Sequence, residues 1–277
     1  MMKRLLMTML LMAIGASNAG AQDIKREITR VTDDVYRFQN RFHVNMFVIT
    51  GDGVVVTDPI NPEAASWLRA EIGQLTDQPI THLIYSHSHG DHASGGTEFG
   101  DVPNVIVHQN APKEMDLVEP TIRFSDQMSF SAGSKTFELT YLGPGHGNDL
   151  IAIVVRPDNV AFVVDAVSSK RLFFRDFPGA NIDHWTDQVK KVYALDFEVM
   201  IGGHGPVGVK SDVADGIAYL DELRAAVLKG LKAGRSVEEL KQSVKMEKYS
   251  AWASYDRWRE LNVLGMARYL VESGEVK

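Results

Sequence analysis

The chain has 277 residues, of which 44% are hydrophobic, and it carries a formal net charge of −7 and no cysteine. This length and apolar content suffice for one domain or one layered sandwich with a full core. The absence of cysteine excludes a disulfide framework, a thiolate nucleophile and thiolate metal ligands. The acidic balance argues against a nucleic-acid partner, because phosphates are bound by clustered Lys and Arg.

The first 21 residues have the pattern of a secretory signal. Lys3 and Arg4 form a positive region, residues 5–14 an apolar run, and residues 19–21 (Ala-Gly-Ala) a cleavage site. The apolar run has 10 residues, whereas a helix that spans a bilayer needs roughly 20. We therefore expect a secreted protein, most simply a periplasmic one, with no stable membrane anchor.

The first half of the remaining chain alternates strand and helix patterns. Gly51-Asp52-Gly53 predicts a hairpin turn. Asn61-Pro62-Glu63 predicts the start of a helix, which ends near Leu75, because it combines a polar cap, an early proline and an early acid. Strands are predicted at 35–38, 43–50, 54–57, 80–86 and 105–107, with helices on both sides of the last one between residues 93 and 117.

The second half repeats the order of strands followed by helices. Its predicted strands cover residues 137–142, 151–155, 160–164 and 199–201, and its predicted helices 182–195, 212–233, 236–246 and 254–273. A capping box, Ser236-x-x-Glu239, marks the start of the third of these helices. Two such halves predict an α+β fold, a four-layer αββα sandwich with two sheets face to face. We expect a signal at 1–21, a catalytic domain at 22–210 and a packed helical extension at 211–277.

The sharpest motif is His87-x-His89-x-Asp91-His92, which directly follows a predicted strand. His87 and His89 are two residues apart, so an extended backbone places both side chains on one side. Asp91 and His92 come from the following turn and can face a second point nearby. Zinc accepts imidazole nitrogen and carboxylate oxygen as ligands, and a catalytic zinc site keeps one position for water.

Three more residues of ligand type end strands or lie in glycine-rich turns. They are His146 within residues 143–147, Asp165 after a predicted strand, and His204 within residues 202–206. The glycines allow sharp turns behind a ligand. The turns are not phosphate cradles, because neither has the strand–GxGxxG–helix context.

In this order the seven residues resemble the metallo-β-lactamase superfamily of zinc hydrolases, over residues from about 31 to 206. The resemblance implies two zinc ions per chain. It assigns His87, His89 and His146 to the first ion, Asp91, His92 and His204 to the second, and Asp165 to a bridge between them. It also implies that Asp58 orients a ligand histidine by accepting its other N–H.

The chain departs from the cysteine-bearing β-lactamase class at two positions. Asp165 stands where that class has a thiolate, and Ser168 stands where it has a lysine that grips the substrate carboxylate. We therefore expect β-lactamase activity to be weak at most. Three nearby cations are candidates for the role of the lysine: Lys170, Arg171 and Arg175.

Four of the nine histidines stand outside this set of seven candidate ligands. We interpret His82 and His108 as structural and His184 as a surface residue of a helix. His43 precedes a strand near a loop that often borders the pocket in the similar family, so its role is open between structure and pocket. The aromatic group Tyr249, Trp252, Tyr255 and Trp258 is interpreted as helix packing rather than as a substrate platform.

The sequence thus predicts a secreted dinuclear zinc hydrolase for a small-molecule substrate, and it fixes no oligomeric state. Two zinc ions about 3.5–4 Å apart lower the pKa of a shared water from 15.7 toward about 7, which gives a bridging hydroxide nucleophile. Asp91 orients this nucleophile and carries a proton to the leaving atom. The bond cleaved is an amide, ester, lactone or thioester. Two alternatives stay open: iron or manganese in the same site, with sulfur or oxygen chemistry, and a periplasmic metal-binding partner protein with a vestigial site.

Overall fold

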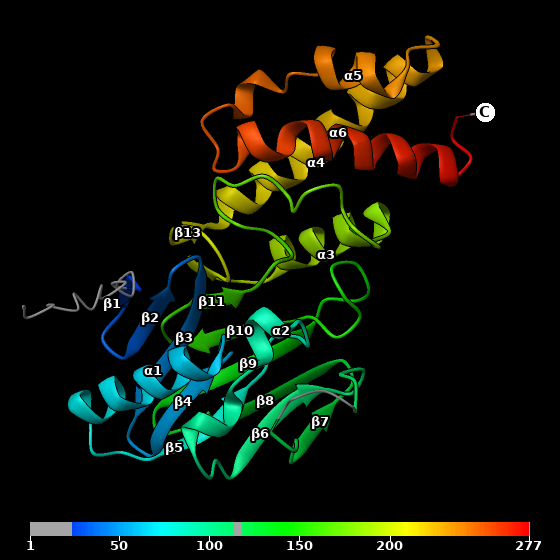
Figure 1. The fold of residues 1–277 in the computed structure, drawn as a ribbon. Helices are drawn as coiled ribbons and strands as arrows, with labels where there is room; N and C mark the ends of the chain where they lie inside the picture. Colours follow the sequence, from blue (N-terminus) through cyan, green and yellow to red (C-terminus); the bar gives the residue numbers. More distant parts are fainter. Residues whose placement is uncertain (1–23, 114–117, 277) are drawn as a thin grey trace, which may run out of the picture.

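The computed structural model describes residues 24–113 and 118–276. The predicted signal at 1–21 lies outside the described residues, as do residues 114–117 of the helix expected before residue 117. In the described ranges the chain forms two β-sheets with helices outside them (Figure 1).

The first sheet has seven strands, which follow one another in chain order. They are β1 (Arg26–Arg30), β2 (Val35–Asn40), β3 (His43–Thr50), β4 (Gly53–Thr57), β5 (Ile80–Ile84), β6 (Asn104–His108) and β7 (Ile122–Phe124). Strands β1 to β4 pair antiparallel, and those from β4 onward pair parallel. Parallel neighbours need a crossover, which α1 (Pro62–Leu75) supplies between β4 and β5.

The second sheet has six strands in the order β13-β12-β11-β10-β9-β8. They are β8 (Gln127–Ala132), β9 (Lys135–Tyr141), β10 (Ile151–Arg156), β11 (Val160–Val163), β12 (Val199–Gly202) and β13 (Gly208–Val209). Only β11 and β12 pair parallel within it. The connection between them contains α3 (Ile182–Ala194), so the helix again serves as the crossover.

Apolar side chains fill the space between the sheets and the space under the helices. Met46 and Val55 of the first sheet belong to the same core cluster as Ile153 and Phe162 of the second. On the outer face of the first sheet, α1 buries apolar residues that include Leu68. Asn61 caps α1, because its side chain accepts a hydrogen bond from the backbone N–H of Ala64.

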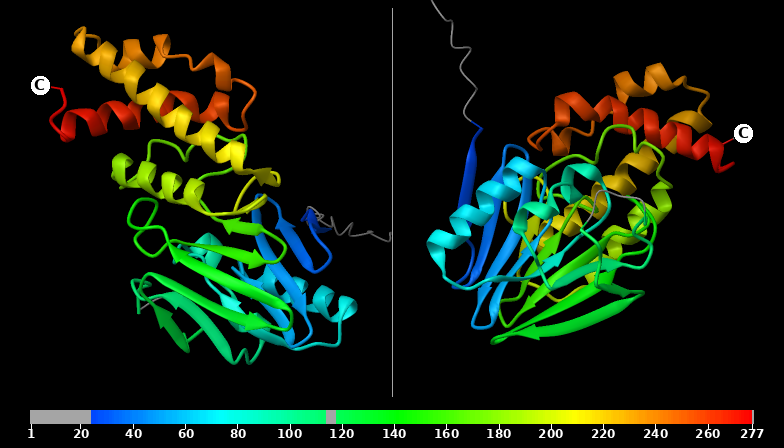
Figure 2. Two further views of the ribbon diagram at one scale, coloured as in Figure 1. Left: turned by 180° about the vertical axis from the view of Figure 1, so that it is seen from behind. Right: turned by 60° about the horizontal axis from the view of Figure 1, so that its bottom comes forward.

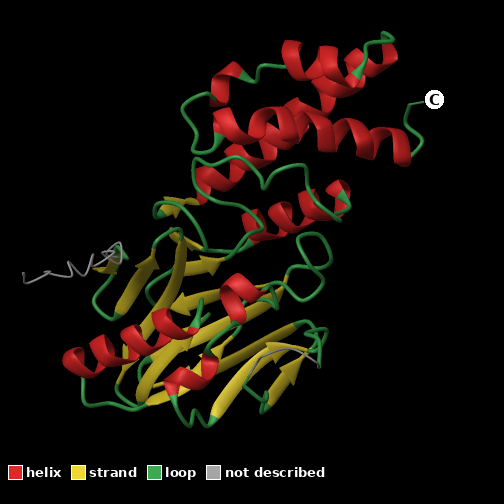
Figure 3. Cartoon of the chain, in the orientation of Figure 1, coloured by secondary structure: helices red, strands yellow, loops and turns green. Residues whose placement is uncertain are grey.

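The C-terminal helices gather at one end of the molecule (Figures 1 and 2). They are α4 (Lys210–Lys232), α5 (Val237–Ser243) and α6 (Tyr255–Glu272). The predicted capping box forms at the start of α5, where the Ser236 and Glu239 side chains bond each other's backbone. Helices outside two mixed sheets confirm the predicted α+β sandwich (Figure 3).

The sequence patterns missed four short or exposed strands, namely β1, β7, β8 and β13. Strand β8 (Gln127–Ala132) alternates polar and apolar residues at the edge of its sheet, so it lacks the apolar run of a buried strand. The helix expected after residue 93 is also replaced, by the short α2 (Gly90–Ala93) and the 3₁₀ turn η1 (Gly96–Phe99). Gly95 separates them with a φ of 91°, a left-handed conformation that ends a helix.

Among the described residues, no helix combines the length and the apolar character needed to cross a bilayer.

Candidate metal centre

All seven predicted ligands converge at one edge of the sandwich, where strands of both sheets end. His87 and His89 follow β5, Asp91 and His92 lie in α2, His146 follows β9, Asp165 follows β11, and His204 follows β12. Residues from 87 to 204 therefore meet because the carboxyl ends of these strands lie together.

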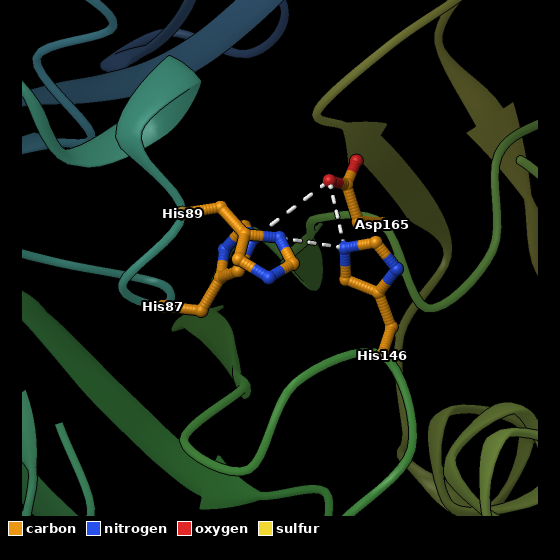
Figure 4. A group of neighbouring side chains, drawn as sticks. All are labelled: His87, His89, His146 and Asp165. Carbon is orange, nitrogen blue, oxygen red and sulfur yellow. Dashed lines mark hydrogen bonds and ion pairs between the residues drawn. The ribbon is translucent and has the colours of Figure 1, made fainter. Parts of the chain in front are cut away.

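The first group consists of His87, His89, His146 and Asp165, whose ligand atoms all lie within 4.8 Å of one another (Figure 4). Nδ1 of His89 lies 3.0 Å from Nε2 of His146. Oδ2 of Asp165 lies 3.2 Å from Nε2 of His146 and 3.7 Å from Nε2 of His87. The group contains the three histidines expected to hold one ion and the carboxylate expected to bridge.

The second group consists of His92, Asp165 and His204. Oδ1 of Asp165 lies 3.2 Å from Nε2 of His204, while Oδ2 lies 3.5 Å from Nε2 of His92. Asp165 thus belongs to both groups and turns one oxygen toward His204 and the other toward the first group. This is the placement that a bridging carboxylate needs.

Asp91 groups instead with His43 and His204. Its Oδ2 lies 3.1 Å from Nε2 of His43 and 3.8 Å from Nε2 of His92. His43, whose role the sequence left open, therefore faces the cluster. Its signal in the sequence is weak, because it is the first residue of β3 and lies far from the motif in the chain.

The backbone turns sharply at Asp165. Its φ is 54°, in the left-handed region that aspartate and asparagine enter more readily than most residues. The backbone N–H of Ala166 donates to the carbonyl of Val164 at 2.6 Å across this turn. The turn aims the carboxylate out of the end of β11 and into the cluster.

Asp58 supports the motif from beneath, and it does so partly through Ser86. The Ser86 backbone N–H and hydroxyl donate to Oδ1 and Oδ2 of Asp58 at 2.7 and 2.6 Å. The Ser86 hydroxyl also lies 3.0 Å from Nδ1 of His87, and Asp58 Oδ2 lies 3.5 Å from Nδ1 of His92. Asp58 therefore contacts one ligand histidine directly and another through a serine that sequence reasoning missed.

Gln188 holds the loop that carries His146. Its Oε1 accepts from the backbone N–H of His146 at 2.7 Å, and its Nε2 donates to the carbonyl of Gly143 at 2.6 Å. Gly145 makes this approach possible, because a Cβ there would lie 2.4 Å from Gln188 Oε1. The sequence does carry a signal for Gln188, a polar residue at helix spacing from the buried Trp185.

Burial and neighbouring charges shift the pKa values of the histidines in the cluster in opposite directions. Burial lowers the pKa of His87 well below its usual value, and neighbouring histidines add to this. Burial also acts on His92, but the carboxylates of Asp165 and Asp58 outweigh it and raise the pKa of His92, so a metal ion that binds its Nε2 would displace a proton. The hydrogen bond from His43 is the main cause that holds the pKa of Asp91 well below its usual value. Both carboxylates that line the cluster, Asp91 and Asp165, are thus ionised at neutral pH.

The donor set fits a divalent transition metal. Nε2 of His87 and Nε2 of His92 are buried and have no hydrogen-bond partner among the described residues. Burying such a nitrogen costs free energy unless a hydrogen-bond partner or a metal ion replaces the water that it loses. Imidazole nitrogens and carboxylate oxygens are ligands of zinc, and they also suit iron and manganese.

The other histidines have structural surroundings, as expected. Nε2 of His108 lies 2.7 Å from the carbonyl of Ser125, and its ring stacks on Tyr141 at 3.8 Å between centroids. His82 stacks on Phe130 at 4.6 Å. His184 is exposed on α3.

A cavity of about 1280 Å³ opens over the cluster. His89, Asp91, His146, Asp165 and His204 contribute to its lining, and so does Trp258 of α6. The interpretation of the C-terminal aromatic group as packing holds for Tyr249, which is buried against Tyr219 and Trp252. It is incomplete for Trp258, which packs edge-on against Phe174 and also faces the cavity.

Comparisons with known proteins agree with this fold. The family model described as the metallo-β-lactamase superfamily matches residues 40–204, and the chain belongs to this superfamily. The metallo-β-lactamase of Pontibacter korlensis superposes with a TM-score of 0.64 at 19% identity, covering 71% of this chain and 99% of that structure. This likeness shows the fold.

Two relatives extend the picture. A type 2 metallo-β-lactamase of Bacteroides fragilis is 24% identical over 199 residues, which cover 65% of this chain and 80% of that protein. The 2,4-dinitroanisole O-demethylase subunit alpha of Nocardioides sp. (strain JS1661) is 23% identical over 228 residues, 78% of this chain and 67% of that protein. Relatives of this chain are thus named for different reactions.

Proposed function

We propose that this chain is a dinuclear zinc hydrolase that cleaves an acyl bond of a small molecule. One ion would be held by His87, His89 and His146 and the other by Asp91, His92 and His204, with Asp165 shared between them. The observation that carries the proposal is the position of Asp165, whose two oxygens face different histidines at 3.2 Å. A carboxylate so placed offsets the repulsion between two cations.

When bound, the ions would activate water and polarise the substrate carbonyl. The residues of the chain orient the reacting groups and transfer the proton. Asp91 is ionised and anchored through Oδ2 by His43, which orients the carboxylate at the cavity. There it can accept a hydrogen bond from an entering water and pass a proton to the leaving atom.

Export belongs to the same proposal and rests on the first 21 residues. Cleavage after Ala21 would give a mature chain that begins at Gln22. N-terminal sequencing of protein recovered from the periplasm tests this. Recovery of an intact Met1 terminus from a membrane fraction would contradict it.

A substrate panel tests the hydrolase proposal. Metal-depleted protein, before and after zinc is restored, is offered a β-lactam, a lactone, a thioester and a phosphoester, with His89→Ala as the control variant. We expect cleavage of at least one acyl substrate only after zinc is restored, and none by His89→Ala. Hydrolysis rates that do not change when zinc is restored, or turnover of the phosphoester alone, would contradict the hydrolase proposal.

2,4-Dinitroanisole belongs in the same panel. The similarity to a protein named as a 2,4-dinitroanisole O-demethylase subunit makes ether cleavage the second candidate function. Zinc-dependent loss of the methyl group, with no turnover of any acyl substrate, would favour that candidate over the first.

A further inference from the structure

Two arginines from distant parts of the chain lie against the same ring in the cavity wall. Arg171 belongs to the loop after β11, and Arg257 to the first turn of α6. Their guanidinium carbons lie 4.8 and 5.8 Å from the ring centroid of Trp258. All three residues line the cavity that also contains the histidine cluster.

Backbone hydrogen bonds fix the two segments to each other. The N–H of Leu172 donates to the carbonyl of Ala253 at 3.1 Å, and the N–H of Ala253 donates to the carbonyl of Lys170 at 2.8 Å. Arg171 and Ala253 thus form a parallel bridge four residues before Arg257 in the chain. The C-terminal extension therefore sets where both arginines stand.

Neither guanidinium has a hydrogen bond or an ion pair with a described residue, in contrast to other cations nearby. Lys170 lies 3.0 Å from Asp212 Oδ1 and also pairs with Asp215. Arg37 donates to the carbonyl of Gly205 at 2.9 Å. Burial lowers the pKa of Arg171 and repulsion by Arg257 adds to this, while the carboxylate of Asp165 acts in the opposite direction. A half-buried guanidinium with no hydrogen-bond partner is costly. An anion bound at Arg171 would remove this cost, and the exposed Arg257 beside it offers the anion a second cation.

Only one of the three cations that were candidates to bind a substrate carboxylate fits that role. Lys170 is occupied by Asp212 and Asp215. Arg175 is exposed, lies over the ring of Phe174 and is absent from the cavity lining. Arg171 faces the cavity. The family match ends at residue 204, so Arg257 and Trp258 lie beyond the part of the chain that the family shares.

We propose that Arg171 and Arg257 form an anion-binding subsite that takes a carboxylate of the substrate, with both guanidinium groups held against the ring of Trp258. Arginine binds carboxylate through paired N–H donors, so two arginines can fix its orientation. The inference rests on the proposed function, because it takes the bound carboxylate to be part of the substrate of that hydrolase. It adds that the substrate carries a carboxylate and that the C-terminal extension selects it.

The test is a calorimetric titration of metal-depleted protein at pH 8 with 4-nitrobenzoate and with 4-nitrobenzamide, which share shape but not charge. We expect wild type to bind the acid at least tenfold more tightly than the amide. Arg257→Gln and Arg171→Gln should each lose tenfold or more of this affinity, and Arg257→Lys should lose less. Arg175→Gln is the matched control and should bind as wild type.

Equal binding of acid and amide, or unchanged affinity in Arg257→Gln, would overturn the subsite. Arg257 is exposed, so this variant should fold, and circular dichroism checks that it does. Displacement of 4-nitrobenzoate by inorganic phosphate at equal concentration would overturn the assignment to a carboxylate. Because the measurement uses no metal, its failure would leave the hydrolase proposal standing, and failed hydrolysis would not change the binding result.

Discussion

At the scale of single residues, the proposed dinuclear centre depends most on Asp165. Asparagine has nearly the same shape, but it lacks the charge and has one good acceptor oxygen. We expect Asp165→Asn to keep the fold and the first zinc ion. Affinity for the second ion should fall more than about tenfold, as it does even for residues that only support a ligand.

Zinc titration of this variant, with hydrolysis followed at trace and at excess zinc, measures the effect. Asp165→Cys is the companion variant, since thiolate binds zinc well and should restore part of the affinity. Unchanged occupancy and rate in Asp165→Asn at trace zinc would mean that Asp165 is a strand-end residue that caps a turn.

Ser86 is the residue through which Asp58 reaches His87. Ser86→Ala removes a buried hydrogen bond to a carboxylate, so the free energy of unfolding should fall by about 1.5–3 kcal/mol. If the serine also orients His87, zinc affinity should fall by about 10–100-fold. Urea unfolding and competition with a chelator separate the two effects. Lower stability with unchanged zinc affinity would restrict Ser86 to a structural role.

These residues show what a sequence can and cannot predict about the site. The convergence of the seven residues was predictable, because five of them follow strands and the other two, Asp91 and His92, belong to the same short motif as His87 and His89. The role of Ser86 was not predictable and that of His43 stayed open, because a serine at the end of a predicted strand and a histidine at the start of one look like ordinary β-sheet residues. Their roles depend on which strands become neighbours, and this is a property of the sheet.

At the scale of elements, the buried pair of Lys135 and Asp158 links the start of β9 to the turn between β10 and β11. Their charged atoms lie 2.8 Å apart, and Thr32 also donates to Asp158 at 2.6 Å. Burial alone would raise the pKa of Asp158, but these partners outweigh it and lower that pKa. The contribution of Asp158 to stability is therefore complete above its unfolded pKa of about 3.9 and is lost as the pH falls through the folded value.

We expect Asp158→Asn to lower the free energy of unfolding by about 2 kcal/mol at pH 7. The difference from wild type should shrink as the pH falls below about 3.9. Asp34→Asn is the control, because Asp34 contacts the same lysine at 2.9 Å but is 44% exposed. It should cost less than about 1 kcal/mol. Urea unfolding from pH 7 to pH 3 measures this difference, and a difference at pH 3 as large as that at pH 7 would contradict the account.

Helix α6 packs closely enough on the loop after β11 to exclude one methyl group. A Cβ at Gly265 would lie 2.3 Å from the backbone oxygen of Asp176. Gly265→Ala should therefore destabilise the protein by about 1–3 kcal/mol. Gly73→Ala in α1, where a Cβ meets no atom within 4 Å, should stabilise it by up to about 1 kcal/mol. Thermal unfolding compares the two, and equal shifts would show that the contact at Gly265 relaxes.

The same scale explains which elements the sequence predicted. Buried strands such as β10 and β11 were found because they are almost entirely apolar and mostly β-branched or aromatic. Edge strands such as β1 and β8 were missed because half of their side chains face solvent. Pairing with a neighbour gives these segments their form, and a local pattern does not record that neighbour.

At the scale of the whole molecule, one cavity joins the two sheets to the C-terminal helices. The histidine cluster belongs to the part that matches the family, residues 40–204. Trp258 and Arg257 of the extension line the same cavity. We therefore expect the part that matches the family to determine the reaction and the C-terminal extension to determine which substrate binds.

The measurement that tests the central claim most directly is native mass spectrometry of the metal-depleted protein titrated with zinc. Wild type should take up two zinc ions per chain at saturation, and Asp165→Asn should show the first ion at zinc concentrations where the second is missing. No bound zinc at saturation, or one ion in both proteins, would contradict a dinuclear centre built on Asp165.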